Sequence, residues 1–417
     1  MNAAGPSFQY ATHDDLITGN SPWGDGMPGP RRESLDESFH TDVAIIGGGI
    51  TGALIAENLS GQGYSVAVLD RERVGLGSTR ASTAMLQWEI DTPLIELAGL
   101  YGFEAAADIY RRSFAAVAGL RQLVTARRIR CALTPRDALY LAAEEMGEKE
   151  LAEEFAMRRR AGLPGQLLNH DALKEQYGID RAAAILSPGS AQADPLLLCW
   201  WLLTIAANRK ARIIDADAIH FHDEGERVVV ETTGPHVVEA KHVVLATGYA
   251  MPHFIMPRQH EIRSSFALAT VPQAPERLWR DGALIWEAAE PYSYMRLTAD
   301  NRIVIGGEDE DVSDPQERDA MLGEKTETLR QTLARLIPGA DPTVSHAWCG
   351  AFGETSDGLP LIGRVPGARH VYAAYGYGGN GITFSYMASR MIAALMKGEE
   401  KAWFDNFALD RPDLPES

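Results

Sequence analysis

The sequence predicts an α/β protein in which a Rossmann-like domain carries an inserted antiparallel-sheet domain of the α+β class. Two glycine-rich turns lead to this fold class: one follows a short strand near residue 47, and the other, at residues 376–381, stands between a strand and a helix. A series of closely spaced short strands lies between the two turns. This order is typical of one α/β domain interrupted by a β-rich one.

The first glycine turn has the spacing of a dinucleotide-binding site. An apolar strand, Val43–Ile46, ends at Gly47, Gly49 and Gly52, which are spaced G-x-G-x-x-G. Gly47 permits a tight turn, Gly49 lets the backbone approach a pyrophosphate, and Gly52 lets the following helix pack closely. The N-terminus of that helix offers unpaired N–H groups and a partial positive charge to phosphates.

The segment after this turn completes a strand–turn–helix–strand unit. The helix ends at Gly61 and Gly63, and a second strand, Tyr64–Leu69, stops at Asp70. A carboxylate at the end of this strand is placed to accept hydrogen bonds from a ribose. We therefore expect a bound dinucleotide rather than a purely structural βαβ unit.

Length, charge and cysteine content limit the class of protein. A chain of 417 residues exceeds what one hydrophobic core usually serves, so two packed domains are expected. The net charge of −18 disfavours general binding to nucleic acid or to anionic membranes. No stretch approaches the roughly 20 apolar residues of a membrane span, and the N-terminus lacks the pattern of a secretory signal. Three scattered cysteines form neither a disulfide framework nor a zinc pattern, so we expect a cytoplasmic protein.

The order of elements suggests discontinuous domains. Residues 1–40 form an N-terminal arm, and residues 401–417 form a C-terminal tail. We assign the nucleotide-binding domain to residues 41–100, 180–255 and 345–400. We assign the substrate domain to residues 101–179 and 256–344.

Local signals place the other elements. Helices are expected at 110–124, after the N-caps Asn169, Asp194 and Asp314, and at Ile382–Met396. Strands are expected at 212–215, 218–222, 227–232, 236–239, 242–246, Ile262–Thr270, Tyr292–Leu297, Arg302–Gly306 and Val371–Ala374, with hairpin turns at 223–225 and 298–301. Residues 75–87, GLGSTRASTAMLQ, are expected to form a loop.

Two further motifs bear on which dinucleotide is bound. The segment Val243–Gly248 is an apolar strand that closes on Ala-Thr-Gly, the second signature of flavoproteins with two dinucleotide-binding domains. The turn at residues 376–381 also matches G-x-G-x-x-G and could indicate a second nucleotide. Too few residues follow it for a second complete unit. We therefore interpret it as a helix N-terminus aimed at a flavin ring, where it would stabilise negative charge.

Together these blocks resemble the D-amino-acid oxidase/sarcosine oxidase/glycine oxidase (DadA-like) family of FAD-dependent oxidoreductases. The matching blocks are the first glycine unit, GLGSTRAST, Ala-Asp-Pro at 193–195, VVLATG, and AWCGAFGETSDGLPLIGR…YAAYGYGGNGITFS. They extend from about residue 40 to 396, and the resemblance implies a Rossmann-like FAD-binding domain of the two-dinucleotide-binding-domain flavoprotein type. The Ser21-Pro22-Trp23 element resembles a bacterial subgroup that includes gamma-glutamylputrescine oxidase-like proteins.

The resemblance assigns cofactor-binding residues along the chain. For the ADP half of FAD these are Gly47, Gly49, Ile50, Thr51, Gly52, Asp70 and Arg71. Those that pass the pyrophosphate and approach the isoalloxazine are Gly77, Ser78, Thr79, Ser82 and Thr83. Those that line the cofactor or cap the pyrimidine end of the flavin are Thr247, Gly248, Gly350, Gly378, Gly379, Asn380, Gly381, Ile382 and Thr383.

Covalent attachment of FAD is a separate question, because some relatives attach it through a cysteine. Cys349 lies near that position, before Thr355-Ser356-Asp357-Gly358. The Trp-Cys-Gly triplet around it aligns with the Trp-Ala-Gly of non-covalent members. The resemblance therefore favours non-covalent FAD, with Cys349 leaving the covalent alternative open.

The resemblance implies oxidation of a small-molecule amine or amino acid by hydride transfer to flavin N5, giving an imine that hydrolyses. Arg296 is the first candidate for gripping a substrate carboxylate as a fork, because relatives use an arginine in a comparable strand. Tyr294 lies on the same strand face as Arg296, and His346 aligns near the flavin. The alternatives are a salt bridge for Arg296, a core position for Tyr294 and a structural role for His346.

Other functions remain open. Relatives in the wider superfamily oxidise an alcohol or 2-hydroxy acid on the same fold, and nothing in the sequence decides between C–N and C–O substrates. A non-catalytic flavoprotein is the alternative from a different class. Oxygen, a quinone or an electron-carrier protein could accept the electrons, and the oligomeric state is not readable from the sequence.

Overall fold

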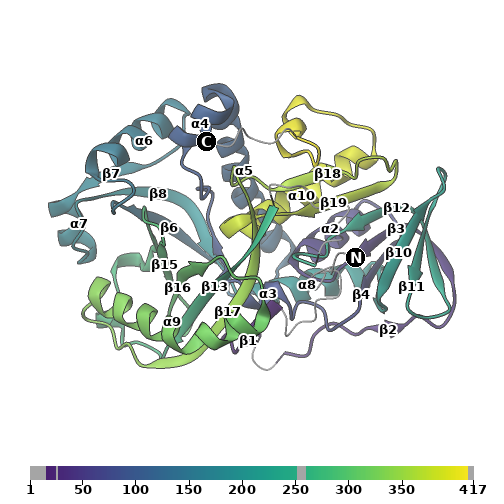
Figure 1. Cartoon of the computed structure of the whole chain (residues 1–417), viewed down its shortest axis with the longest axis horizontal. Helices are drawn as coiled ribbons and strands as arrows, with labels where there is room; N and C mark the ends of the chain where they lie inside the picture. Colours follow the sequence, from purple (N-terminus) through teal and green to yellow (C-terminus); the bar gives the residue numbers. More distant parts are fainter. Residues whose placement is uncertain (1–15, 25–26, 251–259, 412–417) are drawn as a thin grey trace, which may run out of the picture.

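The computed structural model describes residues 16–24, 27–250 and 260–411, which are organised around two β-sheets that lie side by side (Figure 1). The nine-stranded sheet follows the order β10-β11-β12-β3-β4-β9-β2, with β19 also pairing β12 and β18 pairing β19. Its strands are β10 (Ala218–Asp223), β11 (Val228–Thr232), β12 (Val237–Leu245), β3 (Phe39–Ile46), β4 (Val66–Asp70), β9 (Arg212–Asp215), β2 (Glu33–Ser34), β19 (Val371–Tyr375) and β18 (Leu361–Arg364).

The ten-stranded sheet follows the order β1-β17-β13-β16-β15-β14-β6-β8-β5, with β7 pairing β8. Its strands are β1 (Ile17–Gly19), β17 (Val344–Thr355), β13 (His260–Thr270), β16 (Ile303–Glu310), β15 (Ser293–Leu297), β14 (Leu284–Glu287), β6 (Thr134–Leu141), β8 (Ala183–Gln192), β5 (Met85–Leu86) and β7 (Gln166–Asn169). The expected antiparallel sheet is thus mixed, because β14 pairs with β6 in parallel.

Helices cover both sheets. They are α2 (Ile50–Gly61), α3 (Ser78–Ala81), α4 (Leu94–Tyr101), α5 (Phe103–Arg127), α6 (Glu148–Arg160), α7 (His170–Tyr177), α8 (Pro195–Asn208), α9 (Pro315–Leu336) and α10 (Gly381–Met396), with 3-10 turns η3 (Pro275–Arg277), η4 (Arg280–Gly282), η5 (Gly378–Asn380) and η6 (Ala402–Phe407). No helix in the described part of the chain has both the length and the apolar character to cross a membrane.

The predicted strand–turn–helix–strand unit is present as β3, α2 and β4. Strands β3 and β4 pair in parallel, and β12 pairs in parallel with the other edge of β3. Helix α2 contacts both α8 and α10, and its residues from Thr51 to Ser60 are buried. A helix enclosed on all sides need not be amphipathic, and its buried Glu57 is paired with Arg127 and Arg209.

The three predicted helix starts are also confirmed. The side chain of Asn169 accepts a hydrogen bond from the Ala172 N–H at the start of α7. Asp194 accepts from two N–H groups of α8, and Asp314 does the same for α9. In both cases a proline follows the cap, where the missing N–H costs nothing because the first helical N–H groups have no partner within the helix.

Two local predictions were wrong. The strands expected at 236–239 and 242–246 are one strand, β12, because β12 pairs continuously with β3 and the Lys241 Nζ lies 2.8 Å from the Asp42 Oδ1 across that pair. The segment 75–87, expected to be a loop, contains the one-turn helix α3 and the short strand β5. Thr79 of α3 accepts a hydrogen bond from the Ile50 N–H, a contact distant in sequence that local patterns do not indicate.

Sheet membership differs from the predicted domain boundaries at three strands. Strand β5 falls within 41–100, β8 within 180–255 and β17 almost entirely within 345–400, yet all three belong to the ten-stranded sheet. Helix α5, within 101–179, packs against α10. Pairing with strands distant in sequence decides these positions, and local periodicity contains no information about such partners. The segment 1–40 supplies β1 to one sheet and β2 to the other.

Candidate active site

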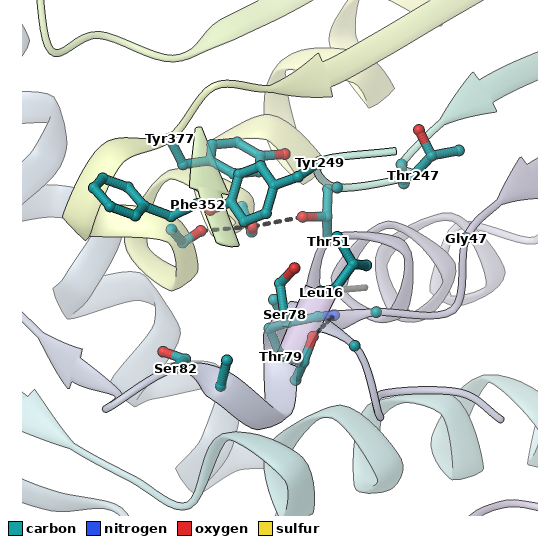
Figure 2. Close-up of a pocket in the computed structure, with 18 of the residues that line it drawn as sticks. Leu16, Gly47, Thr51, Ser78, Thr79, Ser82, Thr247, Tyr249, Phe352 and Tyr377 are labelled. Carbon is teal, nitrogen blue, oxygen red and sulfur yellow. Dashed lines mark hydrogen bonds between the residues drawn. The ribbon is translucent and has the colours of Figure 1, made fainter. Parts of the chain in front are cut away.

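A cavity of about 340 Å³ lies between the two sheets, lined by residues from both. The N-termini of α2 and α10 reach it and are joined there, because the Thr51 and Ser385 hydroxyl oxygens lie 2.8 Å apart. Figure 2 shows the aromatic side chains Tyr249, Phe352 and Tyr377 gathered on one side, with serine and threonine side chains of the α3 region opposite them. Two helix N-termini directed at one cavity favour a ligand that carries or develops negative charge.

The glycines of the first turn have different roles. Gly47 has φ +106°, and a Cβ there would lie 2.3 Å from the Ala246 carbonyl oxygen. A Cβ on Gly52 would lie 2.0 Å from the Gly47 carbonyl oxygen, so both glycines are required by the protein itself. A Cβ on Gly49 would meet only the Thr79 hydroxyl, at 3.2 Å. Gly49 lines the cavity, so its missing side chain leaves room for a ligand.

The carboxylate of Asp70 lies at one end of the cavity, where β4 ends. Its Oδ2 accepts a hydrogen bond of 2.7 Å from the Gly48 N–H, and its Oδ1 accepts one of 2.9 Å from the Glu72 N–H. Arg71 and His220 are the basic side chains among the described residues that line the cavity. Both belong to the nine-stranded sheet and its loops, so this end suits the ribose and adenine of a dinucleotide.

The middle of the cavity is formed by the N-terminus of α2 and by α3. The Ile50 N–H donates a hydrogen bond of 2.9 Å to the Thr79 hydroxyl. Ser78 and Ser82 lie beside Thr79 in the cavity wall. Hydroxyl groups together with the N–H groups of a helix N-terminus are the donors that bind phosphate oxygens.

The glycine turn before α10 holds a neighbouring chain segment as well as lining the cavity. The Gly379 N–H donates a hydrogen bond of 2.6 Å to the Asp91 Oδ2. The Asn380 side chain donates to the Glu89 carbonyl oxygen, and the Thr383 hydroxyl donates to the Gln87 carbonyl oxygen at 2.9 Å. Thr383 and Gly52 are the two members of the predicted cofactor-binding set that do not line the cavity.

The end of the cavity formed by the ten-stranded sheet is aromatic and acidic. Tyr292, Tyr294 and Trp286 line it, with Asp91 and Asp309. The Tyr294 ring lies across the neighbouring strand, because a Cβ on residue 306 would be 2.5 Å from the Tyr294 hydroxyl and glycine occupies that position. Tyr294 lines the cavity, and its role in positioning a substrate stays a prediction.

The two aspartates at this end have raised pKa values. Burial is the main cause that raises the pKa of Asp309 to about 7. The Glu354 and Asp91 carboxylates also raise this pKa, whereas the Ser265 hydroxyl and the charge of Arg263 lower it. Asp91 faces the cavity, yet the removal of water by the surrounding protein raises its pKa to about 6 despite the hydrogen bond from Gly379. Neither residue belongs to a recognisable motif, and only the pairing of distant strands brings them together.

Arg296 and His346, the other predicted substrate contacts, do not line the cavity. Arg296 is 2% exposed, and its guanidinium donates a hydrogen bond of 3.0 Å to the Ala193 carbonyl oxygen. It also lies 4.6 Å from the ring of Trp23, in the N-terminal arm. His346 is half-buried near the start of β17, where its Nδ1 lies 2.9 Å from the Ser345 hydroxyl. The cavity ends before both residues, so the structure does not bring them to the positions that the sequence suggested.

These observations together fit FAD. The cavity runs from the Asp70 carboxylate, past a helix N-terminus with room at Gly49, to a second helix N-terminus beside an aromatic wall. The residues that the sequence assigned to the ADP half and the pyrophosphate line this cavity, apart from Gly52, which serves the packing of α2.

Comparison with known proteins gives the same result. Residues 42–395 match the family model described as FAD dependent oxidoreductase (DAO). Gamma-glutamylputrescine oxidoreductase of Escherichia coli (strain K12) is 27% identical over 392 residues, which cover 90% of this chain and 88% of that protein. The glycine oxidase of Geobacillus kaustophilus (strain HTA426) is 26% identical over 382 residues, which cover 87% of this chain and 94% of that protein.

A solved structure shares the fold. The crystal structure of glycine oxidase from Geobacillus kaustophilus matches with a TM-score of 0.74 and 24% sequence identity, covering 90% of this chain and 100% of that one. The family model spans most of the sequence, from β3 to the last turn of α10. This chain belongs to the DAO family of FAD-dependent oxidoreductases.

Proposed function

We propose that this enzyme oxidises an amine or amino acid at its carbon–nitrogen bond, giving an imine that water hydrolyses. The observation that carries the proposal is the acidic end of the cavity, where Asp91 and Asp309 line the wall. Amines arrive from water as cations and are attracted to carboxylates, whereas a 2-hydroxy acid is an anion and is repelled. The two relatives named above support the same choice, because their names describe nitrogen compounds.

FAD, when bound, supplies the two-electron chemistry by accepting hydride from the carbon that bears the nitrogen. The chain itself orients the substrate and controls charge. The Tyr292 and Tyr294 rings, with centroids 5.7 Å apart, form a wall that excludes water and limits how a substrate can lie. The N-terminus of α10 contributes positive potential to the cavity, which would stabilise negative charge on a bound, reduced cofactor.

We propose that FAD is bound without a covalent link. Cys349 alternates with Trp348 and Gly350 along β17, and those two neighbours line the cavity while Cys349 does not. Its thiol lies on the opposite face of the sheet, 3.9 Å from an Asp319 oxygen of α9. Burial raises its pKa to about 11, so it is also a poor nucleophile. Acid precipitation of the holoenzyme should release all of its flavin, and flavin that stays with the pellet would contradict this proposal.

The reaction class is tested by anaerobic reduction of the purified holoenzyme. The panel contains primary and N-methyl amines, D- and L-amino acids, and 2-hydroxy acids, and the readout is loss of flavin absorbance. We expect bleaching by nitrogen compounds alone. Bleaching only by hydroxy acids would overturn the proposal in favour of carbon–oxygen oxidation, and a flavin reduced by no member of the panel would favour a non-catalytic flavoprotein.

A further inference from the structure

We propose that the substrate carries a positive charge in addition to its reacting nitrogen, and that Asp309 binds this second charge against an aromatic wall. The inference rests on the proposed carbon–nitrogen oxidation and narrows its substrate class to diamines and related polycations. It also assigns Asp309 as a specificity-determining residue.

The aromatic wall is built by two neighbouring strands. Tyr294 of β15 and Tyr292, which directly precedes that strand, are two residues apart, and their ring centroids lie 5.7 Å from each other. Trp286 of β14 pairs directly with Tyr294 in the strand register, and its indole lines the same cavity. Aromatic faces attract ammonium and alkylammonium groups through their quadrupoles, most strongly where water is excluded.

Asp309 provides the charge at this wall. Its Oδ1 is buried and has no hydrogen-bond partner among the described residues. Leaving a buried carboxylate oxygen without a partner costs free energy, which a bound cation would recover. The Asp309 carboxylate lines the cavity, so such a cation can reach it.

The surrounding charges add to the negative potential. Asp91 lines the cavity from the segment before α4, and Glu354 lies on β17. Arg263 of β13 is the cation facing them, but it is shared between Glu354, at 2.9 Å, and Glu290, at 3.9 Å. Four carboxylates around one guanidinium leave this end of the cavity anionic. A carboxylate-bearing substrate would be repelled there.

The chemistry of the reaction indicates that this charge is not the reacting nitrogen. The reacting amine must be neutral to release hydride from the adjacent carbon, and an ionised carboxylate beside it would stabilise the protonated form. A second, distal ammonium group has no such conflict. It can remain charged against Asp309 throughout the reaction.

A matched series of substrates tests the proposal on the holoenzyme. The compounds 1,4-diaminobutane, 1-aminobutane and 4-aminobutanoate have the same chain length and differ only in the distal group, which is positive, absent or negative. We expect the second-order rate constant for anaerobic flavin reduction to fall in that order. The diamine should exceed 1-aminobutane by about tenfold or more, the factor typical of one charge-assisted contact.

Variants assign the effect to Asp309. Asp309→Asn should reduce the diamine preference to within about twofold, and Asp311→Asn, an exposed aspartate two residues further on, is the matched control that should keep it. If Asp309→Asn fails to fold, Asp309→Ser takes its place, since it removes the same carboxylate with a smaller side chain. An undiminished preference in the folded variant, or a preference for 4-aminobutanoate, would overturn the proposal.

A binding titration separates this proposal from the proposed function. Tetramethylammonium has no neutral amine form, so the enzyme cannot oxidise it by removing hydride. Its Kd, read from the shift in the flavin spectrum, therefore reports the cation site alone. We expect binding in wild type and the Asp311→Asn control, and binding weakened about tenfold or more in Asp309→Asn. Absence of binding in wild type would overturn the cation site even if amines reduce the flavin. Binding with flavin reduced only by hydroxy acids would keep the site and refute carbon–nitrogen oxidation.

Discussion

Gly49→Val tests the position of the cofactor pyrophosphate, because this glycine can be changed with little cost to the protein alone. Its φ of −76° and ψ of −172° are extended values that valine adopts readily. The new Cβ would lie 3.2 Å from the Thr79 hydroxyl oxygen and would meet no other atom of the surrounding protein within 4 Å. The added side chain would project into the cavity that Gly49 lines.

The expected effects on folding and on binding differ in size. For the protein without FAD, a small adjustment of Thr79 is offset by the reduced freedom of the unfolded chain, so the free energy of unfolding should change by no more than about 1 kcal/mol. A cofactor at 100 times its Kd stabilises the folded state by about 2.7 kcal/mol. The variant should lose this contribution, which for a chain of 417 residues corresponds to a fall in Tm of roughly 3 °C in the presence of FAD.

The assay combines the FAD-to-protein ratio after purification with thermal unfolding in the presence and absence of added FAD. Gly323→Val is the matched control, because a Cβ at this exposed position of α9 meets nothing within 4 Å. Gly47→Ala should instead fail to fold, since φ is +106° and its Cβ would lie 2.3 Å from a carbonyl oxygen. A folded Gly49→Val protein that retains FAD at full occupancy would refute the placement of the pyrophosphate beside this glycine.

Three further predictions follow from buried charges. Burial holds the pKa of Asp309 at about 7 against an ordinary value of 3.8, so its carboxylate destabilises the fold fully above pH 7 and progressively less as the pH falls toward 4. Asp309→Asn should therefore stabilise the FAD-free protein more at pH 8 than at pH 5, with the gain in the free energy of unfolding larger at pH 8 by on the order of 1 kcal/mol or more. A gain that does not depend on pH would contradict this. Arg296→Met should lower stability by about 1–3 kcal/mol through lost contacts with Trp23 and the Ala193 carbonyl, while KM for the best amine stays within about twofold; a large rise in KM would return Arg296 to the substrate site. The Arg411 Nη2 lies 2.7 Å from the Asp357 Oδ1, and both side chains are buried. Arg411→Ala should cost about 3–5 kcal/mol in urea unfolding, whereas the double variant Arg411→Met/Asp357→Asn should cost clearly less, and equal losses would argue against an uncompensated charge as the cause.

The strand–turn–helix–strand unit that lines one end of the cavity could be predicted from the sequence because it is local. Gly47, Gly49 and Asp70 belong to one strand–turn–helix–strand unit, and each acts through backbone conformation or a position at a strand end. The helix starts at Asp194 and Asp314 were predictable for the same reason, since a cap acts within three residues. These features depend on neighbouring residues in the sequence and not on contacts with distant parts of the chain.

The substrate end could not be predicted in this way. Strand alternation correctly placed Tyr294 and Arg296 on one face of β15, but it contains no information about where the cavity ends or that Trp23 of the N-terminal arm covers the second residue. Asp91 and Asp309 stand more than two hundred residues apart in the sequence, and only the packing of the two sheets places both in one wall. Their chemical importance comes from burial, which exists only in the folded protein.

This difference in construction has a functional consequence. The cofactor end depends on one contiguous unit, in which a change at Gly47 or Gly52 also damages the fold. The opposite end is assembled from single side chains on β14, β15 and β16 and on the segment before α4, each replaceable without breaking the strand that supports it. Substitution of Asp309 or Trp286 can therefore alter which amine is bound while FAD stays in place. A family built on this arrangement can share one cofactor site and differ in substrate, which is why the proposed specificity has to be argued from the acidic and aromatic wall rather than from the fold.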